Sequence, residues 1–229
     1  MSRGLGDVYK RQPILFAYAK MNVNTPVIQE TNKKPLHEIR EGISEARKNP
    51  IIFGNLLAAG IVSSLILNMG TYGPLFADRV LHKGLDGFGS ILFAAGAGSM
   101  ASGILSATSS THYSQRFIFT AAGLCGLLLM AVSYIFWTIP ALFMFALLGF
   151  ATILFMVNCN TAIQMASPPE YLGRIMGLYT FVFLGSAPFG SLLVSAIIEY
   201  MGTSLGLAIV GLFEIILILL TAKTYSKQK

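Results

Sequence analysis

Residues 117–169 read FIFTAAGLCGLLLMAVSYIFWTIPALFMFALLGFATILFMVNCNTAIQMASPP and contain no aspartate, glutamate, lysine or arginine. A helix that crosses a membrane needs about 20 predominantly apolar residues, so this stretch is long enough for two crossings. The segment FWTIP at residues 136–140 divides it, because proline ends one helix and can open the next. The stretch therefore predicts two membrane-spanning helices joined by a tight hairpin.

The composition of the whole chain indicates the same environment. Of its 229 residues, 54% are hydrophobic and only 11% are charged, whereas a soluble domain carries about 25% charged residues. Further stretches that carry at most one charge are residues 51–73, 87–109, 175–198 and 205–222. The sequence thus predicts an all-α integral membrane protein with six transmembrane helices, which occupy residues 51–222.

The distribution of lysine and arginine predicts the orientation, because positive residues collect in cytoplasmic loops. If residues 23–50 form a cytoplasmic linker and residues 223–229 a cytoplasmic tail, the opposite side keeps only Arg79 and Lys83. Both ends are then cytoplasmic, and the net charge of +6 follows from topology, so no nucleic-acid partner is expected. The basic residues assigned to the cytoplasmic side are Lys20, Lys33, Lys34, Arg40, Arg47, Lys48, Arg116, Arg174, Lys223, Lys227 and Lys229.

The linker contains the segment KKPLHEIREGISEARKNP, residues 33–50. Leu36, Ile39, Ile43 and Ala46 recur at helical spacing, and charged residues fill most positions between them. This pattern predicts an amphipathic helix that lies on the membrane face.

Two stretches resemble a known family. The order of a basic linker, LHEIREGISEARKNP and a span resembles the central cytoplasmic connection of major facilitator superfamily exporters, in the branch of siderophore and macrolide efflux proteins. Residues 160–202, NTAIQMASPPEYLGRIMGLYTFVFLGSAPFGSLLVSAIIEYMG, are similar to the tenth and eleventh helices of that branch, with a Gly-x-x-Pro-x-Gly helix after a proline-acidic loop. Leu172 departs from the pattern, because many relatives have an arginine there.

The resemblance covers residues 13–229 and implies a secondary active transporter that exports a small molecule by alternating access, with proton coupling. Such exporters have twelve helices in two halves, each built from two inverted three-helix repeats. Residues 51–222 would then be the C-terminal half, and residues 13–22 the tail of a truncated sixth helix. The expected partners are a small-molecule solute, the lipid bilayer of a bacterial cytoplasmic membrane and a missing N-terminal six-helix half.

The beginning of the chain resembles a sequencing-adapter scar. DVYKRQ, residues 7–12, can be read as the translation of GATGTGTATAAGAGACAG, the transposon-end sequence used in sequencing libraries. Residues 1–12 are therefore predicted to be an artefactual leader, which must be excluded from fold reasoning. The alternative is a genuine polar cytoplasmic leader.

Amide side chains within the spans are candidates for a substrate cavity, because a polar group in hydrocarbon is costly unless it faces protein or water. Asn160 and Gln164 share one helix face at a spacing of i, i+4. The resemblance implies that the first and fourth spans line the central cavity. The alternative is hydrogen bonding between helices, worth about 0.6 kcal/mol on average. The candidate cavity residues are Asn55, Asn68, Asn158, Asn160 and Gln164.

Glu214 is the only ionisable residue deep within a predicted span. It lies nine residues before Lys223, roughly 13 Å along a helix, so its carboxyl group cannot easily reach the headgroups. An acid in the membrane is a functional candidate by default, which makes Glu214 a candidate proton-coupling residue. The alternative is a protonated side chain bonded to a neighbouring hydroxyl, because the twelfth helix of the family is peripheral.

Glycines predict where helices approach each other closely. In the second span Gly89, Gly96 and Gly103 lie seven residues apart, so one helix face is nearly smooth. Such faces pack helices in any membrane protein, which is the alternative to a gating role. The corresponding packing or gating candidates of the fifth span are Gly185, Pro188 and Gly190, together with Arg174 at its inner end, which is expected to meet a loop partner or a lipid phosphate.

The sequence favours neither an enzyme nor a metalloprotein. No HExxH motif, phosphate loop or paired-aspartate motif occurs, and no predicted span holds a histidine that could activate Ser102 as a nucleophile. Cys125 and Cys159 lie within spans and are interpreted as packing residues. No cofactor or metal is therefore expected, and the alternative function is a non-transporting six-helix membrane interaction protein.

Overall fold

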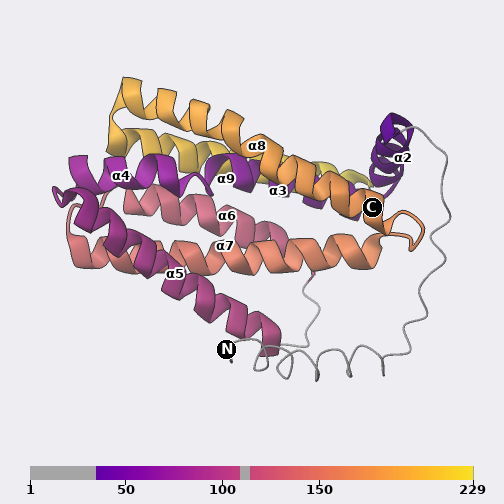
Figure 1. The fold of residues 1–229 in the computed structure, drawn as a ribbon, viewed down its shortest axis with the longest axis horizontal. Helices are drawn as coiled ribbons and strands as arrows, with labels where there is room; N and C mark the ends of the chain where they lie inside the picture. Colours follow the sequence, from indigo (N-terminus) through magenta and orange to yellow (C-terminus); the bar gives the residue numbers. More distant parts are fainter. Residues whose placement is uncertain (1–34, 109–113, 229) are drawn as a thin grey trace, which may run out of the picture. The chain divides into compact units, whose positions relative to one another are not determined.

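A computed structural model describes residues 35–108 and 114–228, which are helical and contain no strand within these ranges (Figure 1). The predicted leader, the predicted tail of helix six and the first part of the linker lie outside the described residues. The helices are α2 (Pro35–Lys48), α3 (Pro50–Leu65), α4 (Met69–Arg79), α5 (Gly84–Thr108), α6 (Gln115–Val132), α7 (Thr138–Ala166), α8 (Leu172–Met201) and α9 (Thr203–Gln228).

Six helical segments of the described chain are long and apolar enough to cross a membrane, which confirms the predicted fold class. Apart from the first, their limits agree with the predicted ones to within a few residues. The FWTIP segment does separate two spans, because α6 ends at Val132 and α7 begins at Thr138, with Pro140 in its first turn. The spans are Pro50–Arg79, Gly84–Thr108, Gln115–Val132, Thr138–Ala166, Leu172–Met201 and Thr203–Ser226.

The first span is broken. The prediction of one continuous helix over residues 51–73 is wrong, because α3 ends at Leu65 and α4 begins only at Met69. At the break the Asn68 amide donates to the Ser64 carbonyl oxygen, and the Tyr72 hydroxyl donates to the Ile66 carbonyl oxygen at 2.8 Å. These side chains satisfy backbone groups that a continuous helix would pair by itself, so the interruption is tolerated inside the bundle.

The packing of the spans has the symmetry of two inverted triplets, one made of α3–α4, α5 and α6 and the other of α7, α8 and α9. The middle helix of each triplet packs on the first helix of the other, α5 on α7 and α8 on α3, and the two last helices, α6 and α9, pack on each other. Inverted three-helix repeats produce this arrangement. The six helices therefore have the arrangement of one half of a twelve-helix fold, as predicted.

Two equivalent helix crossings depend on glycine. A Cβ atom on Gly98 of α5 would overlap the backbone of Ala146 in α7, where the carbonyl carbon lies 2.7 Å from that position. A Cβ atom on Gly190 of α8 would overlap the backbone of Ser64 in α3 in the same way. Without a side chain at these positions the backbones come into direct contact, as small residues allow in membrane proteins.

The turn between α8 and α9 consists of one residue. Gly202 has φ of 81°, a value that residues with a Cβ atom rarely adopt. Its N–H group donates to the Ile198 carbonyl oxygen at 2.9 Å, and its own carbonyl oxygen accepts from Gly206 at 2.8 Å. The fifth and sixth spans are thereby held as a tight antiparallel pair.

The predicted linker helix is present as α2, although its placement on a membrane face stays a prediction. It packs against α8 and α3 through a face that buries Gly42 and Ala46. A 2.7 Å hydrogen bond to Glu45 raises the pKa of Lys48 above its ordinary value at the exposed end of the helix. The helix is therefore attached to the bundle by small residues and keeps most of its charges in solvent.

Candidate functional site

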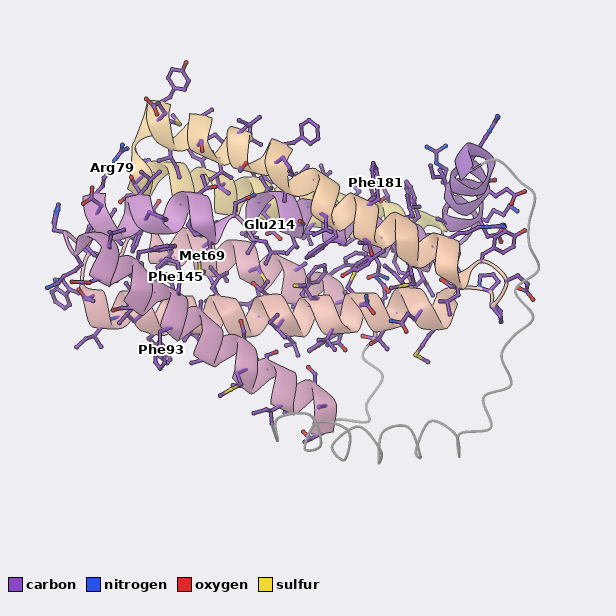
Figure 2. The ribbon with its side chains drawn as sticks, viewed as in Figure 1. Met69, Arg79, Phe93, Phe145, Phe181 and Glu214 are labelled. Carbon is purple, nitrogen blue, oxygen red and sulfur yellow. The ribbon has the colours of Figure 1, made fainter. Side chains whose placement is uncertain are left out.

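The middle helices of the two triplets leave most of their surface uncovered. Within an apolar stretch of 18 residues, only 17% is buried in α5 and 17% in α8. The corresponding stretch of the α3–α4 span is 56% buried. Figure 2 shows Phe93 of α5 and Phe181 of α8 on the outside, and their side chains are 80% and 75% exposed. Together these exposed helix faces form the surface on which a second structure or lipid must lie.

A pair of amides lies near the C-terminal end of α7, at the same end of the bundle as the start of α6. The Gln164 amide donates to the Asn160 side-chain oxygen, as their i, i+4 spacing predicts. Gln164 is exposed and Asn160 half-buried, and the Tyr179 side chain of α8 lies beside Asn160. We call Asn160 and Gln164 the α7 amide pair.

The geometry of α5 explains why this pair is uncovered. α5 contacts α7 closely in the N-terminal half of each helix, where a Cβ on Gly149 would lie 2.9 Å from the Ala95 carbonyl carbon. From that crossing α5 diverges from α7, so the two helices separate toward the end of α5 (Figure 1). Thr161 and Gln164 remain exposed toward the C-terminal end of α7 as a result.

Asn55 does not join the amide pair. Its side chain is fully buried, and its amide nitrogen donates to the Gln115 side-chain oxygen of α6 at 3.0 Å and to the Ile51 carbonyl oxygen at 2.8 Å. Its backbone carbonyl also accepts from the Cys159 thiol at 3.4 Å. For Asn55 the structure favours the alternative of hydrogen bonding between helices.

The remaining amide candidates have local roles. Asn158 is half-buried and donates to the Leu154 carbonyl oxygen of its own helix at 2.7 Å. Asn68 is likewise half-buried and lies at the break between α3 and α4. The predicted set of five cavity residues thus divides into the α7 amide pair, of which Gln164 is exposed, and three side chains with other partners. The cavity role of the pair stays a prediction.

Glu214 lies inside the bundle, at the contact between α9 and α6 (Figure 2). Its side chain is fully buried, and one carboxyl oxygen lies so close to Gly126 that any side chain there would overlap it. Neither carboxyl oxygen has a hydrogen-bond partner among residues 35–108 and 114–228. The hydroxyl partner required by the alternative interpretation is not found in that part of the chain, and a proton-coupling role stays a prediction.

The α6–α9 contact around Glu214 is built from glycines. A Cβ on Gly126 would lie 2.7 Å from the Gly211 carbonyl oxygen, and a Cβ on Gly211 would lie 2.9 Å from the Met130 backbone nitrogen. This contact joins the last helices of the two triplets, so it lies where the pseudo-two-fold axis brings equivalent helices together. The carboxyl group is held where any relative movement of α6 and α9 changes its surroundings.

The predicted glycine face of α5 points away from the described helices. No described atom lies within 4 Å of a Cβ placed on Gly89, Gly96 or Gly103, and the same holds for Gly185 of α8. The close crossing is made two residues further on, at Gly98. The three glycines therefore pack nothing within this half, and their role against another helix stays a prediction.

In α8, Gly190 is a packing position, because it contacts the Ser64 backbone directly. Pro188 is exposed on the same helix. No crossing is made through its side chain, and a gating role for this proline stays a prediction.

Arg174 forms an ion pair with the linker helix rather than with a loop, and a gating role for it stays a prediction. Its guanidinium group lies 2.7 Å from the Glu41 carboxylate of α2, with about a quarter of each side chain exposed (23% and 25%). The central carbon of the Arg174 guanidinium group also lies 5.6 Å from the centre of the Tyr171 ring. The ion pair connects the linker helix to the inner end of α8.

Sequence reasoning missed several of the residues that organise these sites. Gln115 pairs with Asn55 across helices, and Gly98 and Gly149 make the α5–α7 crossing. Asn49 caps α3 and its amide also donates to the Ala166 carbonyl oxygen at 3.2 Å. The dipeptide Asn49–Pro50 before an apolar run is a recognisable helix start, whereas a partner on another helix has no signal in one sequence.

Comparison with known proteins gives one match. A family model described as Major Facilitator Superfamily matches residues 14–191. No curated protein and no solved structure matches the chain.

Proposed function

The chain belongs to the major facilitator superfamily, and from this premise we propose that it is the C-terminal half of a secondary transporter that exports a small molecule by alternating access. Members of the family are transporters and not enzymes, and the six apolar spans make the chain a multi-pass membrane protein. The residues of the 160–202 motif support the siderophore and macrolide efflux branch.

The α7 amide pair carries this proposal. Gln164 is exposed although it lies in a membrane span, and an exposed polar side chain in a span needs water or protein around it. In transporters of this fold the substrate binds near the bilayer midplane between two six-helix halves. The pair lies toward one end of α7 and would therefore face the part of the solute cavity between the midplane and that end, where amide groups can both donate and accept hydrogen bonds.

The second half would cover the exposed faces of α5 and α8. These two helices occupy equivalent places in the two triplets, so one partner of similar symmetry can pack on both. The smooth glycine face at Gly89, Gly96 and Gly103 would let a partner helix approach the α5 backbone. An N-terminal six-helix half supplies such a partner.

Glu214 is proposed as the proton-coupling residue. A buried carboxyl group without a partner is costly when charged, so its protonation must change if its surroundings open to water. A movement of α6 relative to α9 within this half would open their contact and expose the group alternately to the two sides. Proton flow down its gradient could then drive export.

Localisation is part of the same proposal. The concentration of lysine and arginine at one end of the spans supports a bacterial cytoplasmic membrane with both chain ends in the cytoplasm. Thiol-reactive reagents applied to intact cells test it, using Ser226→Cys and Leu85→Cys introduced singly after Cys125 and Cys159 are replaced by serine. Leu85 is exposed at the start of α5, so an impermeant reagent is expected to label position 85 and to spare position 226.

The function is tested by assembling the complete transporter. The DNA upstream of residue 13 is recovered with a primer in the codons for residues 33–49, and the encoded six-helix half is co-expressed with this chain. We expect efflux of at least one solute from a panel, lost in Asn160→Ala and Gln164→Ala and retained in Asn158→Ala. An upstream frame without six spans, or no solute movement by the pair, would favour the alternative of a membrane interaction protein.

The coupling role is tested in the same assembled transporter. Glu214→Gln should abolish the dependence of efflux on external pH, because the amide cannot take part in proton transfer. Glu199→Gln serves as the matched control, since Glu199 is exposed at the outer end of α8. An unchanged pH dependence in Glu214→Gln would remove Glu214 from the mechanism.

A further inference from the structure

A groove of about 1310 Å³ lies between α6, α7 and α9. Gly123 and Leu127 of α6 line one wall, Ile215 and Leu219 of α9 line another, and Met165 of α7 lies between them. The volume exceeds the roughly 300–1,000 Å³ of a site for a drug-sized molecule. It lies on the opposite flank of α7 from its contact with α5, and neither residue of the α7 amide pair lines it.

The groove has the length of one leaflet of a bilayer. On α6 its lining extends from Gln115 to Leu127, twelve residues further on, and on α9 from Ile215 to Ser226, eleven residues further on. These intervals are about 17–18 Å along a helix, and one leaflet of hydrocarbon is about 15 Å thick. An acyl chain that enters at the inner end can therefore lie in the groove along its whole length.

The walls open sideways toward lipid. Leu127 is 48% exposed and Leu219 is 63% exposed, although both line the groove. The floor is aromatic near the inner end, where the rings of Phe119 and Tyr225 meet edge to face with centres 5.8 Å apart. An apolar channel that opens to the bilayer fits a lipid chain and not a water-soluble ligand.

The inner end of the groove favours an anion. Arg116 lines it with an exposed guanidinium group that forms no ion pair with any described residue. The amide nitrogen of Gln115, which also lines the groove, is buried and has no hydrogen-bond partner in residues 35–108 and 114–228. Both belong to the first turn of α6, whose free N–H groups add partial positive charge.

Acidic groups do not oppose this charge. No acidic side chain belongs to the described lining of the groove, and Glu214 faces Gly126 behind the wall. Hydroxyl groups of Ser114 and Ser226 lie at the same end and can donate to phosphate oxygens. The end of the groove therefore combines one cation with several neutral donors.

We propose that this groove is a binding site for an anionic phospholipid, with the phosphate at Arg116 and an acyl chain along Gly123 toward Ile215. The basic side chain and the donors select the headgroup, and the leucine walls hold the chain. The proposal concerns the flank of the bundle and does not depend on transport or on a second half.

Photo-crosslinking tests the proposal directly. The chain is reconstituted in phosphatidylcholine nanodiscs that contain a small fraction of phosphatidylglycerol with a diazirine in its acyl chain, and labelled peptides are identified by mass spectrometry. We expect labelling of α6 and α9 within residues 116–127 and 215–226, reduced by unlabelled phosphatidylglycerol and unaffected by extra phosphatidylcholine or by inorganic phosphate.

Two variants separate the headgroup from the chain. Arg116→Gln should lower the preference for phosphatidylglycerol over phosphatidylcholine about fivefold, as expected for one basic residue near a membrane surface. Gly123→Phe should block labelling, because open space surrounds the added side chain and the fold can accept it. The matched controls are Lys223→Gln, a basic residue of α9 outside the groove, and Gly96→Phe, which also projects into open space but on α5.

Several results would overturn the proposal. Labelling that does not depend on the lipid headgroup would contradict an anionic site, and so would an unchanged preference for phosphatidylglycerol in Arg116→Gln. Competition by inorganic phosphate would indicate a soluble anion in place of a lipid.

Discussion

The α5–α7 crossing allows a sharp test of the packing, because Gly98 and Gly96 lie two residues apart on one helix. A Cβ on Gly98 would lie 2.7 Å from the Ala146 carbonyl carbon, whereas a Cβ on Gly96 meets nothing within 4 Å. Carbon atoms pack at about 3.5–4.0 Å and the Ala146 carbonyl oxygen lies closer still, so Gly98→Ala must push the helices at least about 1 Å apart. Gly96→Ala requires no movement.

The expected magnitudes follow from this difference. Overpacking costs about 1–3 kcal/mol, and a rigid backbone neighbour favours the upper end of that range. Separation also weakens the interhelical bond from the Ser99 hydroxyl to the Gly149 carbonyl oxygen, 3.3 Å long, at about 0.6 kcal/mol. At either site, alanine loses less conformational freedom on folding than glycine does, which stabilises the helix by about 0.5–1 kcal/mol. Gly98→Ala should therefore destabilise the bundle by about 2–3 kcal/mol, and Gly96→Ala should stabilise it slightly.

Thiol modification provides the assay. Both cysteines of the chain, Cys125 and Cys159, are buried and free, so they react only when the bundle opens. The purified chain is titrated with dodecyl sulfate in mixed micelles, and the labelled fraction gives the midpoint of opening. We expect a lower midpoint for Gly98→Ala than for Gly96→Ala. Equal midpoints for the two variants would refute the close contact of Gly98 with α7, whether or not both midpoints differ from that of the unsubstituted chain.

Three other predictions use the same assay. Asn55→Ala should destabilise the bundle by about 1 kcal/mol, because the Gln115 side-chain oxygen loses its partner; a neutral result would mean that this bond contributes nothing. Gly202→Ala should cost about 1–2 kcal/mol, since φ of 81° is strained for alanine; an unchanged midpoint would contradict the turn geometry. In a double-mutant cycle, Glu41→Gln and Arg174→Gln should show a coupling energy of about 0.5–1 kcal/mol, as expected for a partly exposed pair; additive effects would show that the pair does not hold α2.

The fold could be predicted because its strongest signal is chemical and local. Absence of charge over about 20 residues identifies a span without any knowledge of its neighbours. The break in the first span was missed because an apolar run conceals it, although Asn68, Gly70, Gly73 and Pro74 together are a recognisable disruption of a helix. Side chains that bond to free backbone groups, such as the Tyr72 hydroxyl, then determine where the helix ends.

The site was less predictable because it depends on which faces meet. Glycines seven residues apart indicated a packing face on α5, yet the crossing uses Gly98, since the direction in which a helix face points is fixed by its neighbours. Asn55 and Asn160 are chemically the same group, but one faces Gln115 and the other is half-exposed. Only the spacing of Asn160 and Gln164 within one helix was readable in advance.

The central position of α3 has a consequence for biogenesis. The Ser63 hydroxyl donates to the Phe183 carbonyl oxygen, and the Ser186 hydroxyl donates to Gly60, across 120 and 126 residues of sequence. At about 5–20 residues per second, a ribosome needs on the order of 10 s to make that interval. The first span must therefore wait in the membrane for the fifth, and its polar side chains depend on the insertion machinery until α8 arrives.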